Sequence, residues 1–245
     1  MIMYNFYGTI QKGLKHQKND DCFLINGYFS QDSIYDLKSN ENEFIVGVAD
    51  GVGSSSDGSY ASRYLFEQLA KHNTQLTHAV ILNIINKVHS YLSKRFTGNA
   101  LTVFSIIYIS NEKITIYHLG DTRAYKLTPN KNLIQLTNDH TYIQKLIDDG
   151  IISENIRYSH PQKHIILQSL GSNRDIHIDI YKNSFEKGEQ ILLTTDGIHD
   201  YIKEKEIKNI LISSSNLKKN IANLLAEAKA NGSKDDLTAI LVKYI

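Results

Sequence analysis

Short apolar or alternating segments, each bounded by turn residues, recur along the chain and predict β-strands. In FIVGVA (44–49) and QILLTT (190–195) the apolar run is nearly continuous, which predicts strands buried on both faces. The other segments with a strand pattern are MYNFYGTI (3–10), CFLIN (22–26), LTVFSIIYI (101–109), KITIYHL (113–119), RAYKL (123–127), HIILQSL (164–170) and LTAILVKY (237–244).

Helical periodicity is found in two parts of the sequence, each time as a pair of segments. Residues 60–71 and 80–92 form the first pair, with Thr77 as a candidate N-cap, and residues 204–212 and 217–228 form the second. Strict alternation of strands and helices would predict a parallel, doubly wound sheet. Clustered strands with paired helices instead predict an α+β fold, in which helices cover antiparallel sheets.

Composition and charge exclude several classes of protein. The 245 residues show no linker or repeat, so we expect a single domain over residues 1–245. Lys and Arg total 27 against 26 for Asp and Glu, so no charge excess argues for a nucleic-acid or membrane partner. Cys22 is the only cysteine, and no apolar run approaches the ~18 residues of a membrane span. A cytoplasmic protein is the simplest expectation.

Aspartates beside turn residues stand at or near the ends of several predicted strands. Any single Asp–Gly pair is usually only a turn. In 44–50 and 190–196, however, the carboxylate follows a strand that should be buried, and a buried charge needs a partner. Several such carboxylates would repel one another unless a cation neutralised them. The aspartates concerned are Asp21, Asp50, Asp121, Asp196 and Asp235.

An all-oxygen site of this kind suits Mg²⁺ or Mn²⁺, and the ten histidines show no spacing typical of zinc ligands. Metal pairs bridged by carboxylates lower the pKa of a bound water and stabilise in-line attack on phosphorus. No Walker loop or dinucleotide fingerprint offers another way to bind phosphate. The pattern therefore indicates metal-assisted phosphoester hydrolysis.

Six ordered segments resemble the motifs of the metal-dependent protein phosphatases of type 2C, in their compact bacterial form. They are NDD (19–21), DGVGS (50–54), HLGDTRAY (118–125), LTNDHT (136–141), LLTTDGI (192–198) and GSKDDLT (232–238). The resemblance covers nearly the whole chain. It implies a four-layer α-β-β-α sandwich, in which two antiparallel sheets are flanked by antiparallel helix pairs.

The resemblance also implies a role for each aspartate. Asp50 would bridge two Mn²⁺ or Mg²⁺ ions, with the Gly51 carbonyl and Asp21 at the first ion, Asp196 and Asp235 at the second, and Asp121 at a third, weaker one. In such enzymes a water bridging two metals attacks phosphoserine or phosphothreonine directly. The implied partners are a phosphorylated protein substrate and an opposing serine/threonine kinase.

Two positions on the substrate side depart from the family pattern. His16 stands where the family usually has a phosphate-gripping arginine, so we expect His16 to bind the substrate phosphate. Imidazole is only partly cationic at neutral pH, which predicts weaker binding unless Lys12, Lys15 or Lys18 compensates. Val52 offers no general acid where many eukaryotic relatives carry a histidine.

Two more departures lie close to the proposed ligands. Asp236 replaces the usual asparagine beside Asp235, so that it either alters metal affinity or faces solvent. Ser54 replaces a glycine after the second motif, which suggests a modified loop over the cleft. Arg123 is expected to fix the sheet edge rather than touch substrate, and Cys22 to be a small buried hydrophobe.

Three functions remain open from the sequence. The leading one is an active serine/threonine phosphatase, because every family metal-ligand position retains its aspartate. The second is a phosphatase-like binding or regulatory module without efficient turnover, which His16 supports. The third is a hydrolase of another phosphoester, because metals recognise phosphate better than they recognise the group that carries it.

Overall fold

A computed structural model describes residues 3–15, 17–52, 57–73 and 76–245. Its strands form two six-stranded sheets, in which neighbouring strands are antiparallel. The first sheet has the order β4 (Ile34–Ser39), β1 (Tyr4–Gln11), β12 (Leu237–Tyr244), β11 (Gln190–Thr194), β8 (Arg123–Leu127), β9 (Leu133–Gln135). The second has the order β10 (Asp179–Ser184), β7 (Lys113–Leu119), β6 (Leu101–Ser110), β5 (Glu43–Val52), β2 (Cys22–Ile25), β3 (Tyr28–Ser30).

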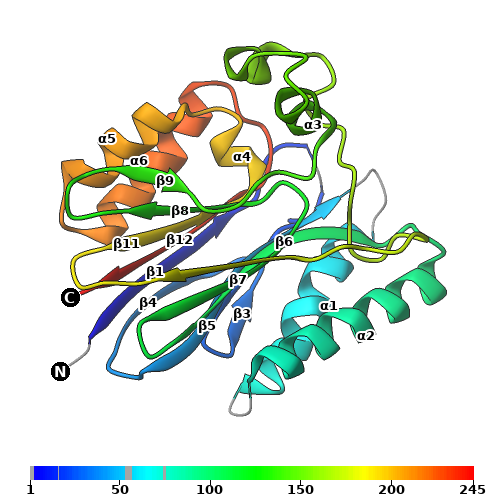
Figure 1. Ribbon diagram of the computed structural model, residues 1–245, viewed down its shortest axis with the longest axis horizontal. Helices are drawn as coiled ribbons and strands as arrows, with labels where there is room; N and C mark the ends of the chain where they lie inside the picture. The colour runs from blue at the N-terminus through cyan, green and yellow to red at the C-terminus, as the bar shows by residue number, and fades with distance from the viewer. Residues whose placement is uncertain (1–2, 16, 53–56, 74–75) are drawn as a thin grey trace.

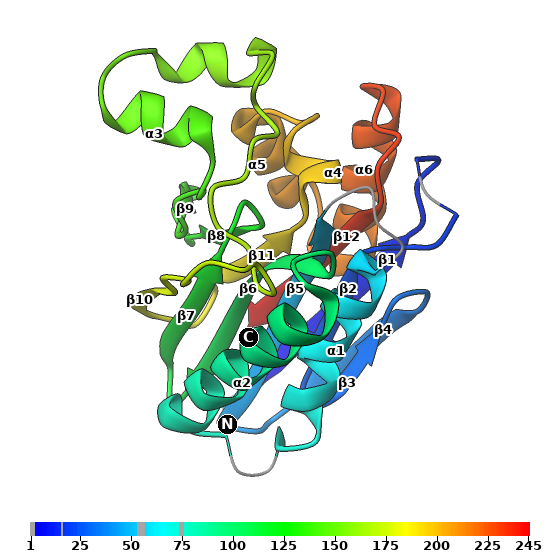
Figure 2. The same cartoon turned by 90° about the vertical axis from the view of Figure 1, so that its right-hand side faces the viewer.

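Helices cover the outer faces of both sheets, which gives four layers (Figures 1 and 2). Helices α1 (Gly58–Ala70) and α2 (His78–Phe96) pack on the second sheet. Helices α5 (Glu204–Ser213) and α6 (Leu217–Ala230) pack on the first, close to the short α4 (Asp196–His199). The expected α-β-β-α sandwich of antiparallel sheets is confirmed.

An apolar core fills the space between the two sheets. Phe6 of the first sheet meets Phe44 of the second edge to face, with ring centroids 4.7 Å apart. Edge-to-face contact is the arrangement that aromatic rings prefer. Because both sheets bury their facing sides, we expect the polar groups of a site to gather at the ends of the strands.

The strand pairing brings distant parts of the chain to one end of the sandwich. Strands β1 and β12 pair so that Gln11 lies opposite Leu237, and the segments that follow β1 and precede β12 therefore meet. In the same sheet Thr194 pairs with both Ala239 and Arg123. The segments around residues 12–21, 121, 196 and 235 are thus neighbours.

Several elements differ from the sequence-based expectation. HIILQSL (164–170) is not a strand, because it forms only isolated bridges at Ile166 and Leu170, to two different partners. Its Ile165 and Leu167 are exposed, so the alternating pattern does not reflect a buried sheet face. The sequence also did not indicate β3, β4, β9, β10, α3 (Tyr142–Asp148) or the 3₁₀ helix η2 (Glu154–Ser159).

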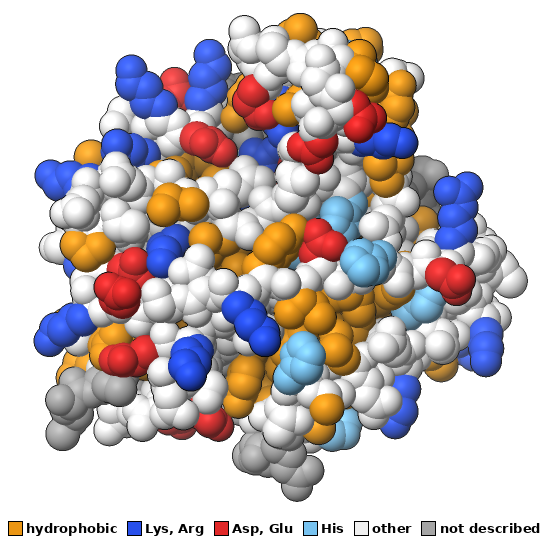
Figure 3. Space-filling view, in the orientation of Figure 1, with side chains coloured by type: hydrophobic (Ala, Val, Ile, Leu, Met, Phe, Trp, Pro, Cys, Tyr) orange, Lys and Arg blue, Asp and Glu red, His pale blue; other side chains and the backbone are white. Residues whose placement is uncertain are grey.

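Two smaller expectations can also be judged. Thr77 caps α2, because its hydroxyl accepts a hydrogen bond from the backbone N–H of Val80. None of the helices among the described residues combines the length and apolar character that crossing a bilayer requires. Positive and negative side chains are interspersed over the face in Figure 3, in keeping with the net charge of +1.

Candidate active site

The structure brings together the five aspartates that the sequence singled out. Asp50 lies near the end of β5, and Asp21 immediately precedes β2, whose Cys22 pairs with Ala49. Asp196 begins α4, directly after β11, and Asp235 precedes β12. Asp121 precedes β8. All five stand at the same end of the sandwich.

The proximity of these aspartates affects the pKa values of their side chains. Burial, followed by the charges of Asp21, Asp196, Asp121 and Asp235, raises the pKa of Asp50 well above its usual range. Burial and then the neighbouring acidic groups likewise raise the pKa of Asp196 to about 7. The neighbouring carboxylates thus oppose the ionisation of Asp50 and Asp196, as expected when like charges share a low-dielectric site.

Asp21 is the most buried of the five, with 1% of its surface exposed. Its Oδ2 atom accepts hydrogen bonds from the hydroxyls of Thr195 at 2.8 Å and Thr238 at 2.6 Å. These threonines belong to the two neighbouring segments that end β11 and begin β12. They fix the orientation of the carboxylate and leave Oδ1 to another partner.

The backbone of Asp50 and Gly51 is hydrogen-bonded to two neighbouring segments and packs closely against the start of α1. The Thr102 hydroxyl donates to the carbonyl of Asp50 at 2.7 Å, and the Gly51 N–H donates to the carbonyl of Asp20 at 3.0 Å. A Cβ at Gly51 would lie 2.4 Å from the backbone of Gly58, where α1 begins. Glycine is therefore required at residue 51 so that α1 can start beside the site.

His199 lies behind Asp121 and connects it to β11. Its Nδ1 atom is 2.9 Å from the Thr194 hydroxyl, and the ring also hydrogen-bonds the backbone of Asp121. Burial, followed by the charge of Arg123, lowers the pKa of this histidine well below its usual value. No sequence pattern singles out His199, because its role depends on a contact with Asp121, which is distant in the sequence.

Asp236, which immediately precedes β12, is hydrogen-bonded to the segment 13–20. Its Oδ1 accepts from the Gly13 N–H and its Oδ2 from the Asp20 N–H, each at 2.7 Å. The side chain is only 4% exposed, so the solvent-facing alternative for Asp236 is wrong. This carboxylate holds both ends of the lysine-rich segment.

The same segment carries Lys15 into the site. The N–H groups of Leu14 and Lys15 donate to the carbonyl of Lys234, and Lys15 Nζ lies 2.5 Å from Asp235 Oδ2. Among the described residues, this is the only ion pair that any of the five aspartates forms. His16, the predicted phosphate-binding residue, lies outside the described residues, as does Ser54.

A buried ion-pair network supports the loop of Asp121. Arg123 is 2% exposed and grips the Asp139 carboxylate through Nε and Nη2, at 3.0 and 2.6 Å. Arg157 of η2 reaches the same carboxylate at 3.2 Å. The expectation that Arg123 is structural is confirmed. Cys22 is fully buried, also as expected.

A further group at the site includes a histidine that the sequence did not indicate. Ligand-type atoms of His164, Asp196 and Asp200 all lie within 4.8 Å of one another. Lys163 pairs with Asp200 at 3.2 Å. Residues 163–170 therefore form a rim across this end of the sandwich, which we call the rim segment.

The residues present fit a pair of hard divalent cations. The donors are carboxylate oxygens from several segments together with a backbone carbonyl at Gly51. Among the described residues only Asp235 has a cationic partner, Lys15, and the other four carboxylates lack the ion-pair partner that buried charges need. Oxygen-only donors of this kind are preferred by Mg²⁺ and Mn²⁺.

Comparison with known proteins identifies the family. The family model described as Protein phosphatase 2C matches residues 23–242, which is most of the sequence. The chain belongs to the protein phosphatase 2C family. The resemblance noted in the sequence is thereby confirmed.

Bacterial members of this family are similar to the chain over nearly their whole length. The serine/threonine phosphatase stp of Listeria monocytogenes serotype 4b is 29% identical over 221 residues, which cover 84% of this chain and 87% of that protein. The protein phosphatase PhpP of Streptococcus pneumoniae serotype 2 is 29% identical over 225 residues, covering 87% and 91%.

Solved structures confirm the fold. The serine/threonine phosphatase PstP/Ppp of Mycobacterium tuberculosis has a TM-score of 0.83 at 21% identity and covers 99% of both chains. The catalytic domain of PstP in complex with two manganese ions has a TM-score of 0.80 at 19% identity. The family model and the bacterial relatives identify the chain as a protein phosphatase, and these structures confirm its four-layer fold.

Proposed function

We propose that this chain hydrolyses phosphoserine and phosphothreonine in proteins, with Mn²⁺ or Mg²⁺ as cofactor. The observation that carries the proposal is the cluster of five aspartates at one end of the sandwich, where burial and the neighbouring carboxylates raise the pKa values of Asp21, Asp50, Asp121 and Asp196. The similar proteins from Listeria and Streptococcus are named as phosphatases, which favours turnover over a binding-only module.

The proposed ligand set follows the position of each aspartate. Asp50 is central, because its pKa is raised by all four of the others. We assign it as the bridge between two ions, with Asp21 and the Gly51 carbonyl at the first, Asp196 and Asp235 at the second, and Asp121 at a third. Bound metals of this type lower the pKa of water and neutralise the charge of the phosphoryl group.

The chain's own residues orient the ligands and the substrate. Thr195 and Thr238 hold Asp21 through one oxygen, so that its other oxygen can face an ion. Lys15 stands above Asp235 and is the described cation best placed to attract a phosphate dianion. Whether His16 also contacts the phosphate stays a prediction.

Three broader assignments belong to the same proposal. The partners are phosphorylated proteins and an opposing serine/threonine kinase, and the location is the cytoplasm. Residues 1–245 act as one catalytic domain, which is supported by the pairing of β1 with β12. That pairing makes both ends of the described chain parts of one sheet.

Hydrolysis of a phosphothreonine peptide and of an aryl phosphate tests the function. We expect activity with Mn²⁺ or Mg²⁺, none with chelator, and a loss on the order of 10²-fold or more in Asp50→Asn. Activity that persists in chelator, or full activity of Asp50→Asn, would contradict the mechanism. Calorimetric titration of Asp50→Asn with Mn²⁺ measures loss of the metal site, and its melting temperature in chelator shows whether the variant still folds.

A further inference from the structure

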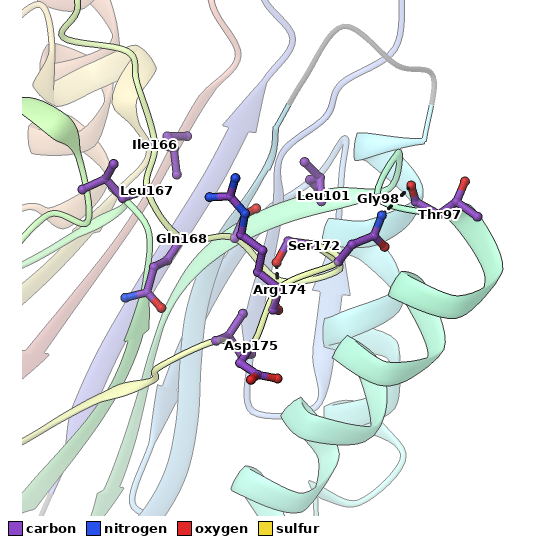
Figure 4. Close-up of a pocket in the computed structure, with 12 residues that line it drawn as sticks. Thr97, Gly98, Leu101, Ile166, Leu167, Gln168, Ser172, Arg174 and Asp175 are labelled. Atoms are coloured by element: carbon purple, nitrogen blue, oxygen red, sulfur yellow. Dashed lines mark hydrogen bonds between the residues drawn. The ribbon is translucent and has the colours of Figure 1, made fainter.

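A pocket of about 310 Å³ is lined in part by the rim segment and is used by none of the roles assigned above. Its walls come from the end of α2, the start of β6, the rim segment and the loop that follows it (Figure 4). Residues that matter here are Leu101, Ile166, Gln168, Asn173, Arg174 and Asp175.

The pocket adjoins the metal-binding end of β5. Leu101 pairs with Val52, and the next residue, Thr102, pairs with Gly51 and bonds the carbonyl of Asp50. Leu170 exchanges two backbone hydrogen bonds with Thr102, at 2.8 and 3.1 Å. Neighbouring strands are ~4.8 Å apart and an extended peptide advances ~3.4 Å per residue. A substrate with its phosphoresidue at Asp50 therefore reaches the pocket within roughly two to four residues.

The walls of the pocket are fixed by hydrogen bonds. Asn173 donates to the carbonyl of Thr97 at 3.1 Å, and Gln168 accepts from the N–H of His177 at 2.7 Å. Gly171 has a φ of +88°, and a Cβ there would lie 2.2 Å from the carbonyl oxygen of Ala100. This close approach holds the loop against the start of β6, so the pocket exists before any ligand arrives.

Arg174 is the cation of this pocket and has no acidic partner among the described residues. Figure 4 shows its guanidinium extending toward the side where Leu101 and Ile166 lie, whereas Asp175 points away. A guanidinium presents paired N–H donors that match the geometry of a carboxylate or phosphate. The arrangement suits an anionic group that arrives from the cleft.

We propose that this pocket binds an anionic side chain of the protein substrate, two to four residues from the phosphoresidue, with Arg174 as its partner. The proposal rests on the proposed phosphatase function and adds a preference for substrate sequence. The anion is a carboxylate or a second phosphate, because both match the same guanidinium.

The test uses phosphothreonine peptides in which a single Glu replaces Ala at each position from four before to four after the phosphoresidue. With Mn²⁺ present, we expect one position to raise kcat/KM about three- to tenfold in the wild type, as for a partly exposed charge pair. Arg174→Ala should abolish this preference and leave hydrolysis of aryl phosphate unchanged. Arg174→Glu should reverse it in favour of Lys at the same position.

Controls separate this proposal from the underlying function. Lys205→Ala removes an exposed cation from α5, on the other sheet, and should keep the preference. A second phosphothreonine at the preferred position identifies which anion binds better. If no position matters, or the preference survives Arg174→Ala, the pocket proposal is wrong although the enzyme is active. If no peptide is hydrolysed, the proposed function fails, and anisotropy of labelled peptides still measures whether Arg174 contributes to binding.

Discussion

Lys15 Nζ lies 2.5 Å from Oδ2 of Asp235, so a side-chain cation already touches one of the proposed metal ligands. Burial lowers the pKa of Lys15, but the hydrogen bond and charge of Asp235 outweigh it and raise the pKa overall. The ammonium is therefore charged at neutral pH. An incoming metal ion would be repelled by this charge, and a phosphate would be attracted by it.

This contact predicts two opposite effects of Lys15→Gln. Removing the cation from Asp235 should tighten Mn²⁺ binding, whereas loss of a charge partner for phosphate should raise KM about three- to tenfold. Isothermal titration with Mn²⁺ and steady-state kinetics measure the two effects separately. Lys18→Gln, an exposed lysine of the same segment, is the matched control and should change neither. An unchanged KM in Lys15→Gln would remove Lys15 from the phosphate site.

Asp236 is predicted to stabilise the segment 13–20 through both of its oxygens. Asp236→Ala leaves the N–H groups of Gly13 and Asp20 without their acceptor, which should destabilise the fold by about 2–4 kcal/mol. Asp236→Asn keeps one acceptor oxygen and should lose about half as much. Urea unfolding measures both. Equal losses in the two variants would show that the hydrogen bond kept by Asp236→Asn contributes nothing to stability.

The metal-free protein is predicted to lose stability as pH rises. The folded state keeps a proton on Asp196 up to a pKa of about 7, whereas an unfolded chain releases it near pH ~4. The stabilisation is thus fully present below that lower pH and is lost as pH rises through the folded-state pKa. Between pH 5 and 8 the melting temperature in chelator should fall, and saturating Mn²⁺ should restore it.

Asp196→Asn provides the control for this pH effect. The amide carries no ionisable proton, so the melting temperature of the metal-free variant should depend less on pH over the same range. A wild-type melting temperature that is constant or rises from pH 5 to 8 in chelator would argue against a crowded cluster of carboxylates.

The pair formed by Arg123 and Asp139 is predicted to be essential for stability. Burial alone would raise the pKa of Asp139. The charge and hydrogen bonds of Arg123 outweigh burial, so that the pKa is lowered overall. Asp139→Ala leaves the buried Arg123 guanidinium without a counter-charge and leaves Arg157 with only its exposed partner Glu154, which should destabilise the protein by about 3–5 kcal/mol. Glu154→Gln alters only an exposed partner of Arg157 and should change the free energy of unfolding by less than about 1 kcal/mol. Similar losses in the two variants would contradict the assignment.

The sequence predicted the fold class and the aspartate cluster because both leave local signals. A buried strand such as 44–49 has a continuous apolar run, and an aspartate directly after it is conspicuous. The helix pairs have clear periodicity, and Thr77 caps α2 as expected. The strand β4, by contrast, is mostly exposed at the edge of its sheet and has no apolar face to reveal it.

The remaining features of the site depend on contacts between distant segments. Asp236 contacts Gly13, 223 positions away, and no local pattern distinguishes a buried carboxylate that accepts two backbone N–H groups from a solvated one. His199 and Arg174 are similarly ordinary in sequence. The apolar pattern of 164–170 was misleading, since Ile165 and Leu167 are exposed and the segment forms only isolated bridges.

The pairing of β1 with β12 has a consequence for synthesis of the protein. Strand β12 is made last among the described elements, yet it lies between β1 and β11, and Thr238 of β12 helps to orient Asp21. A chain still emerging from the ribosome has neither this threonine nor Asp235 in place. Catalytic competence should therefore arise in a single step after translation has passed residue 244, so that no partly made chain can remove phosphate from other proteins.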